Sequence, residues 1–270
     1  MTSRSSLHRR IFSLIVSLAL VLAVSLLFGQ VLGNLYLGNI AANDSKIKTD
    51  LIGETSGKIK VLRLKTIPYY TILVATYEER ESALRLGKSL AEKGLPVIIT
   101  GTSPNQIKLG LLNNEDRLIP LAQSISVDGK RAEVQKGEIN SISFKFANND
   151  TYSAEKIAPF LGELSLCLEK AMLLNADLET NNTNVSKLKP KFIELAEDVE
   201  GLGKRSLELA KAGQDSKHVT YLADLSVVLY NWGQSLAQLG TDWGNAQLLI
   251  SQQQALVVID EYQRFLNSTN

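Results

Sequence analysis

The feature that most constrains this chain is an uncharged stretch near its N-terminus. No Asp, Glu, Lys or Arg occurs between Ile11 and Asn43, and Ile11–Leu32 consists mainly of Leu, Val, Ile, Ala and Ser. As a helix, this run would be about 33 Å long, which is enough to cross the hydrocarbon core of a bilayer. We therefore expect a transmembrane helix at residues 11–32.

The charges around this run predict its orientation. Arg4, Arg9 and Arg10 precede it without a nearby acid, whereas acidic and basic residues are balanced just after it. The positive-inside rule then predicts a cytoplasmic tail at residues 1–10 and a single-pass protein of the cell membrane, with most of the chain outside the cytoplasm. A cleavable signal peptide is the alternative. The length of the run and the lack of a small-x-small site after it favour an uncleaved anchor.

Composition excludes several classes of function. Lys and Arg number 29 against 28 Asp and Glu, and a net charge of +1 does not favour binding to nucleic acid. Cys167 is the single cysteine and lies in an apolar helical pattern, which favours a small buried hydrophobe over a reactive thiol. His8 and His218 are the only histidines, too few for most zinc sites or nucleophile–base systems. We expect no enzymatic activity, no metal and no cofactor.

A β-α-β unit follows a connector at residues 33–68. Tyr69–Tyr77 is rich in aromatic and β-branched residues, which predicts a strand. Acidic residues then begin a helical pattern that ends at Gly94, and Val97–Thr100 is predicted to be a second buried strand. The apolar stripe of the helix consists of Ala83, Leu86, Leu90 and Ala91.

The pattern continues as an α+β region to residue 148. Gln106–Leu112 alternates like a third strand, and a short or late-starting helix follows because Pro120 does not fit a helix interior. Asp128-Gly129 predicts a hairpin turn. Ile139–Phe146 alternates again. Residues 69–148 are thus predicted to form one small mixed domain.

This region resembles the SPOR (sporulation-related repeat) domain family. The residues that carry the resemblance are Tyr70–Tyr77, then Ala83-x-x-Leu86-x-x-x-Leu90-x-x-x-Gly94-x-Pro96-Val97, and Ile107-Lys108-Leu109-Gly110. The family folds as a ferredoxin/RNP-like β-α-β-β-α-β domain and binds peptidoglycan, preferring glycan strands without stem peptides. Many members have an N-terminal membrane anchor and act in division or sporulation.

The resemblance implies a glycan-binding site on the face of the sheet that the helices leave open. We expect Thr71, Leu73 and Tyr77 on one side of the first strand, Thr76 at its exit and Lys108 on the third strand. The alternatives are a core position for Tyr77 and a solvated strand position for Lys108. The family commonly has glutamine where this chain has Leu73, which favours a domain that contacts proteins instead of glycan.

Residues 149–270 have the pattern of a helical domain. Four apolar stripes of helical period are separated by loop-forming segments at residues 181–184, 213–216 and 240–242. Short loops between long helices predict an up-down bundle or long helical hairpins. The stripes favour an intramolecular core, and self-association or docking of a partner helix is the alternative.

The sequence therefore predicts a membrane-anchored, non-catalytic envelope protein with a SPOR-like domain and a helical domain. Peptidoglycan glycan strands are the expected partner, in division or sporulation. The alternative is a scaffold whose SPOR-like domain mediates protein contacts without glycan. A wall hydrolase is a third class, and no pair of acidic residues supports it.

Overall fold

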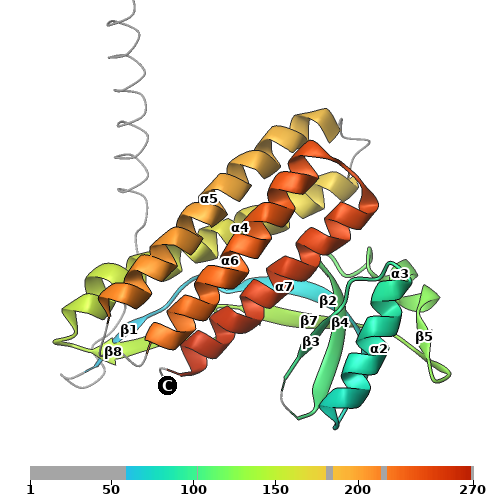
Figure 1. Ribbon diagram of the computed structural model, residues 1–270, viewed down its shortest axis with the longest axis horizontal. Coiled ribbons are helices and arrows are strands. Elements are labelled where there is room, and N and C mark those ends of the chain that lie inside the picture. The colour runs from blue at the N-terminus through green and yellow to red at the C-terminus, as the bar shows by residue number, and fades with distance from the viewer. Residues whose placement is uncertain (1–58, 102, 181–184, 214–217, 269–270) are drawn as a thin grey trace, which may run out of the picture. The chain divides into compact units, whose positions relative to one another are not determined.

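A computed structural model describes residues 59–101, 103–180, 185–213 and 218–268. The predicted membrane helix at residues 11–32 lies outside this range, and within it no helix is both long and apolar enough to span a bilayer. In chain order the elements are β1 Ile59–Leu62, β2 Ile67–Tyr77, α2 Arg80–Glu92, β3 Ile98–Thr100, β4 Asn105–Leu112, α3 Ile119–Ser124, β5 Ser126–Val127, β6 Lys130–Arg131, β7 Glu133–Ile139, β8 Phe144–Ala147, a π-helical turn Ser153–Ile157, α4 Ala158–Thr180, α5 Val185–Ala212, α6 Val219–Thr241 and α7 Asn245–Asn267 (Figure 1). The predicted α+β region followed by helices is confirmed.

The main sheet has four strands in the order β3-β4-β2-β7, and every neighbouring pair is antiparallel. β2 and β3 consequently run in the same direction on either side of β4, and α2 is the crossover between them. After α3 the small β5–β6 hairpin precedes β7, which returns to the sheet beside β2. The chain thus follows a β-α-β-β-α-β course with one inserted hairpin.

A second strand pairing extends from the main sheet. β1 pairs with β8, and β2 pairs with β7, both antiparallel. The short segments 63–66 and 140–143 separate these two pairings. β1 lies within residues 33–68, which the sequence predicts to be a connector. Its alternating residues form a strand by pairing with β8, which lies far along the chain.

Local signals explain two of the turns. α3 begins only at Ile119, so Pro120 falls in its first turn, where a missing N–H costs no helical hydrogen bond. Asp128 and Gly129 adopt φ values of 51° and 76°, the left-handed geometry that a two-residue hairpin requires. Both predictions are confirmed.

One face of the sheet is covered by α2, α3 and the hairpin. Ile72 on β2 and Ile107 on β4 are fully buried there against Ala83 and Leu90 of α2. Three- and four-residue spacing places the apolar side chains of α2 on one stripe, and this stripe meets the sheet.

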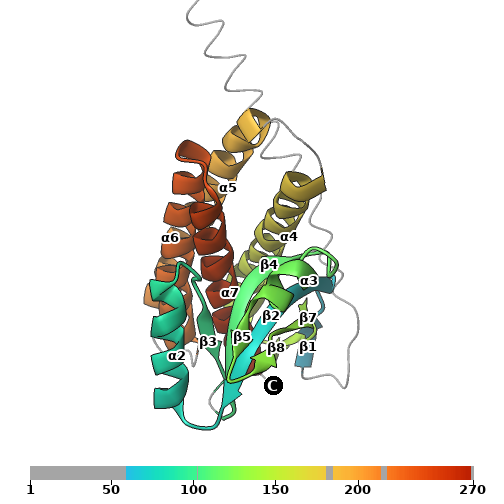
Figure 2. The same cartoon turned by 90° about the vertical axis from the view of Figure 1, so that its right-hand side faces the viewer.

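The opposite face carries the C-terminal helices. α7 contacts β3 and β4, α4 contacts β4, and α5 and α6 lie beyond them (Figures 1 and 2). Tyr69 and Leu111 of the sheet belong to the same buried cluster as Leu256 of α7 and Trp232 of α6. The described sheet and helices therefore share one continuous core and fall within one compact unit.

Glycines let α5 and α6 approach closely. A Cβ on Gly203 would lie 3.3 Å from the carbonyl oxygen of Ser226, and one on Gly233 would lie 3.3 Å from that of Ala196. Gly240 is similarly crowded by the backbone of Lys189. These glycines place backbone against backbone, and α5 and α6 have the most extensive contact of any two helices in the described structure.

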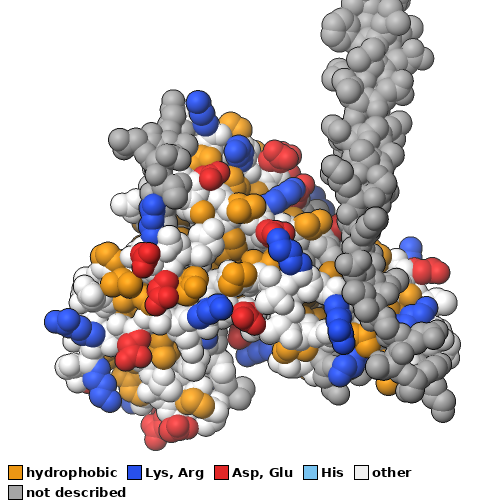
Figure 3. All heavy atoms as spheres, turned by 180° about the vertical axis from the view of Figure 1, so that it is seen from behind, with side chains coloured by type: hydrophobic (Ala, Val, Ile, Leu, Met, Phe, Trp, Pro, Cys, Tyr) orange, Lys and Arg blue, Asp and Glu red, His pale blue; other side chains and the backbone are white. Residues whose placement is uncertain are grey.

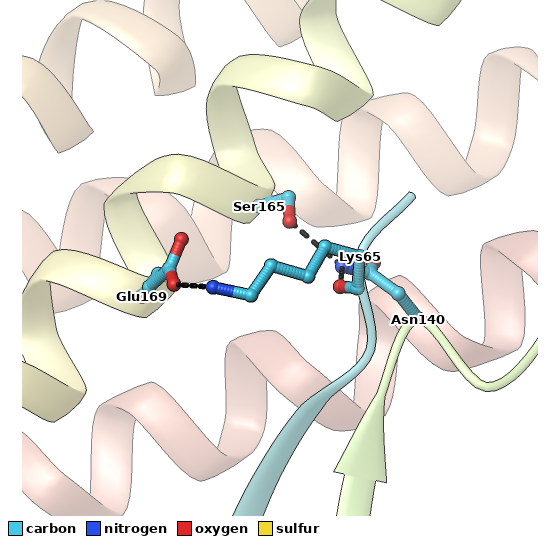
Figure 4. A network of polar contacts seen from close by, with 4 residues as sticks. All are labelled: Lys65, Asn140, Ser165 and Glu169. Carbon is cyan, nitrogen blue, oxygen red and sulfur yellow. Dashed lines mark hydrogen bonds and ion pairs between the residues drawn. The ribbon is translucent and has the colours of Figure 1, made fainter. Parts of the chain in front are cut away.

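Asn140 connects the strands to the helices at the break between β7 and β8. Its amide Nδ2 donates to the carbonyl oxygen of Lys65 at 2.8 Å and to Ser165 Oγ of α4 at 2.7 Å. Its Oδ1 accepts from the hydroxyl of Tyr262 on α7 at 2.6 Å. Beside it, Lys65 Nζ pairs with Glu169 of α4 at 2.5 Å (Figure 4). One buried side chain thus joins four parts of the fold.

We expect Asn140→Gly to lower the free energy of unfolding by about 2–4 kcal/mol, since it leaves the buried Tyr262 hydroxyl and its other partners without a bond. Glycine tolerates the positive φ of 63° at this position, so backbone strain does not contribute. Urea unfolding measures the change. Asp128→Gly is the matched control, also at positive φ but exposed at a hairpin tip, and should change stability by about 0.5 kcal/mol or less. Equal effects of the two variants would contradict the role given to Asn140.

The glycine contact between α5 and α6 gives a second prediction. Gly233→Leu should destabilise the protein by about 1–3 kcal/mol, because the added side chain has to displace the backbone of α5. Gly201→Ala should instead stabilise it by about 0.5–1 kcal/mol, since Gly201 is an exposed helical glycine and a Cβ added there would meet no atom within 4 Å. Thermal melts of both variants test this, and a neutral Gly233→Leu would show that the helices are not closely packed there.

Candidate functional site

The sequence places the candidate site on the face of the sheet opposite α2. Leu73 of β2 lies directly between Lys108 of β4 and Glu133 of β7 in the strand register. This row therefore presents an ammonium, an apolar side chain and a carboxylate next to one another. Leu73 and Lys108 are half-buried, and Glu133 is exposed.

The expectation that this face is open is wrong over much of the sheet, because α7 and α4 pack on it. Polar side chains of α7 bond to the backbone of the sheet and its connections. Gln253 donates to the carbonyl oxygen of Val97 at 2.9 Å, and Gln263 donates to that of Glu138 at 3.0 Å. Part of the sheet face that could otherwise bind a ligand is therefore covered by helices of the same chain.

A bulge in β4 allows further polar contacts between the sheet and the helices. Tyr70 pairs with Leu112 and Ile72 with Leu109, so β4 has one extra residue in this interval. Gly110 supplies the positive φ of 71° there, and Leu111 turns toward the helices. The amide of Leu111 donates to Gln252 Oε1 and its carbonyl accepts from Asn175 Nδ2, both at 3.4 Å.

A second bulge, in β2, separates the predicted site residues. Leu73 pairs with Lys108, but Ala75 pairs with Ile107, so one extra residue of β2 lies between them. Beyond it the side-chain alternation is inverted, and Tyr77 packs with the core under α2 instead of sharing a face with Leu73. Its hydroxyl donates to Asp128 at 3.4 Å. The expected placement of Thr71, Leu73 and Tyr77 on one side is therefore wrong, and Tyr77 lies partly buried against the cluster under α2.

The remaining predicted residues differ in accessibility. Thr71 is 1% exposed and its hydroxyl donates to the carbonyl oxygen of Leu109, so it is part of the sheet interior. Thr76 is exposed and lies opposite Gln106. Together with Leu73 and Lys108, Thr76 marks the strip of this face that remains accessible.

Asp260 of α7 lies beside this strip, within electrostatic reach of Lys108. Burial lowers the pKa of Lys108, and attraction to Asp260 of α7 partly offsets that effect. Burial raises the pKa of Asp260, against the influence of Arg264 and Lys108. Burial also raises the pKa of Glu261, and its neighbour Asp260 adds to that effect. Sequence patterns did not reveal these residues, because Asp260 and Glu261 look like an ordinary solvated helix face.

Reactive groups are sparse in the described part of the chain. No cluster of three or more His, Cys, Asp or Glu with metal-ligand geometry occurs there. The Cys167 thiol is buried, and burial raises its pKa to about 12. His218 packs against the rings of Phe144 and Phe265, which also stack on each other. The accessible strip of Leu73, Thr76 and Lys108 can bind a partner through hydrogen bonds, charge and an apolar contact.

Comparisons with known proteins return no matching family model, no matching curated protein and no matching solved structure. None of these comparisons therefore adds support to the likeness to the SPOR family that the sequence motifs carry.

The two α7 carboxylates predict a pH dependence of stability. Their folded-state pKa values are raised, so the folded state holds protons more tightly than the unfolded state, and stability falls as pH rises through those values, from about pH 4 upward. Asp260→Asn should flatten this decline and raise the melting temperature at neutral pH. Glu208→Gln, at an exposed position on α5, is the control and should leave the profile unchanged. Stability that rises with pH over this range would contradict the assignment.

Proposed function

We propose that this chain is a non-catalytic envelope protein, anchored in the cell membrane by residues 11–32, whose folded unit is a scaffold for protein contacts. The N-terminus would lie in the cytoplasm and the folded unit outside it. The observation that carries the proposal is the position of α7 and α4 on the sheet face where a SPOR-like domain would bind glycan. A face held by the chain's own helices has little area left for a polymer of sugar rings.

The strand order supports a SPOR-like ancestry for the sheet. A ferredoxin/RNP-like β-α-β-β-α-β domain places its first and third strands in the middle, and here β2 and β4 occupy the middle of β3-β4-β2-β7. Two features of this sheet differ from the SPOR family pattern. Leu73 stands where the family commonly has glutamine, and two bulges change which side chains share its face. A SPOR-like fold adapted to helix packing accounts for both observations.

Binding of peptidoglycan glycan strands, in division or sporulation, is the second candidate. It is favoured by the accessible strip of Leu73, Thr76 and Lys108, where an ammonium lies next to an apolar side chain. Such a strip suits one sugar ring with a nearby carboxylate. It would be a shorter site than a sheet face without covering helices.

Sedimentation with sacculi separates the two candidates. Full-length protein in detergent is mixed with isolated sacculi, before and after an amidase has removed the stem peptides. The scaffold proposal predicts that the protein stays in the supernatant in both samples.

Co-sedimentation that increases on denuded glycan and decreases in a Thr76→Ala, Lys108→Ala variant would overturn the scaffold proposal in favour of glycan binding. Tyr77→Ala is the matched control, because Tyr77 lies on the opposite face and its removal should not affect a ligand on the strip. Release of soluble glycan fragments in the same tubes would show enzymatic activity and contradict both candidates.

A further inference from the structure

Helix α4 carries two exposed leucines among apolar residues that are mostly buried. Leu166 is 47% exposed and Leu173 is 57% exposed, whereas their neighbours Leu164, Leu168 and Leu174 are buried. A spacing of seven residues places both leucines on one side of the helix, two turns apart. On the face seen in Figure 3, hydrophobic side chains are interspersed with charges of both signs.

Charges of opposite sign flank the line between these leucines. Glu169 and Lys170 follow Leu166 by three and four positions, so they project to opposite sides of that line. Their partners agree with this geometry, since Glu169 pairs with Lys65 before β2 and Lys170 pairs with Asp198 of α5 at 2.8 Å. The Lys170 side chain is still 54% exposed and that of Glu169 31% exposed, so both have surface available for a further partner.

We propose that two copies of this chain pair through α4, with the two helices side by side and parallel. In this arrangement Leu166 meets the partner's Leu166, and Leu173 meets the partner's Leu173. Each Glu169 then lies next to the partner's Lys170, which gives two equivalent ion pairs. The pairing deepens the scaffold proposal by identifying one of its contacts as a second copy.

The charge pattern favours a second copy as the partner and a parallel orientation of the two α4 helices. In an antiparallel pair, equivalent flanks of the two helices meet, so Glu169 would lie beside the partner's Glu169 and Lys170 beside the partner's Lys170. Like charges at such positions are destabilising, whereas the parallel pair makes both contacts attractive. Two leucines per copy bury little area, so the association is weak in dilute solution and benefits from anchoring in a common membrane.

Disulfide cross-linking of the full-length protein tests the pairing. Cys167 is 6% exposed and has a pKa of about 12, so the natural chain should not form disulfide cross-links through it. Leu166→Cys and Leu173→Cys, each alone in detergent or vesicles with a mild oxidant, should both give covalent dimers. Val227→Cys is the matched control, since Val227 is 59% exposed on α6.

Dimer yields no higher than those of Val227→Cys would overturn the pairing. Cross-links that form only when the Leu166→Cys and Leu173→Cys proteins are mixed would overturn the parallel direction. Either result leaves the sacculus experiment unaffected, so failure of the pairing and failure of the scaffold proposal remain distinguishable.

A charge exchange supplies the second test. In the Leu166→Cys protein, Glu169→Lys or Lys170→Glu alone should lower the dimer yield by about fivefold, because each creates like-charge contacts across the pair. The double exchange E169K/K170E should restore the yield, although it removes the pairs with Lys65 and Asp198 inside each copy. A double variant as poorly cross-linked as the single ones would contradict the proposal.

Discussion

Buried side-chain amides hold the sheet and the helices of this protein together. Asn140 bonds simultaneously to the segment before β2, to α4 and to α7, at a place where the strands are interrupted and backbone groups need other partners. Gln252 and Asn175 do the same for Leu111 at the bulge in β4. Apolar burial supplies most of the stabilisation, but it has no direction. The amides give the helices a defined position on the sheet, because each one has to meet particular backbone atoms.

The helices also cover much of the sheet face that lies opposite α2. A four-stranded sheet with helices on one side leaves a platform on the other, and such a platform suits a polymeric ligand. Here the platform is largely occupied by α7, and the exposed remainder is a narrow strip around Leu73 and Lys108. The sheet is therefore the base on which the C-terminal helices pack.

Much of the fold could be predicted from local signals. The aromatic and β-branched residues of Tyr69–Tyr77 indicated β2, the stripe from Ala83 to Ala91 indicated α2, and Pro120 indicated the late start of α3. The long-range features could not be predicted in this way. Gln252 and Gln253 have the appearance of a solvated helix face, and nothing near Asn140 in the sequence indicates that its partners lie on separate segments. Those contacts depend on which elements meet, and periodicity carries no information about that.

The bulge between Leu73 and Ala75 has a consequence for comparing this protein with others. One extra residue in β2 exchanges the two faces for every position after it. An alignment that matches strands residue for residue would then equate Tyr77 with side chains that project from the opposite side in a regular strand. Ligand-contacting positions can be transferred to this chain only up to Leu73, and beyond that point the correspondence has to be shifted by one residue to compare equivalent surfaces.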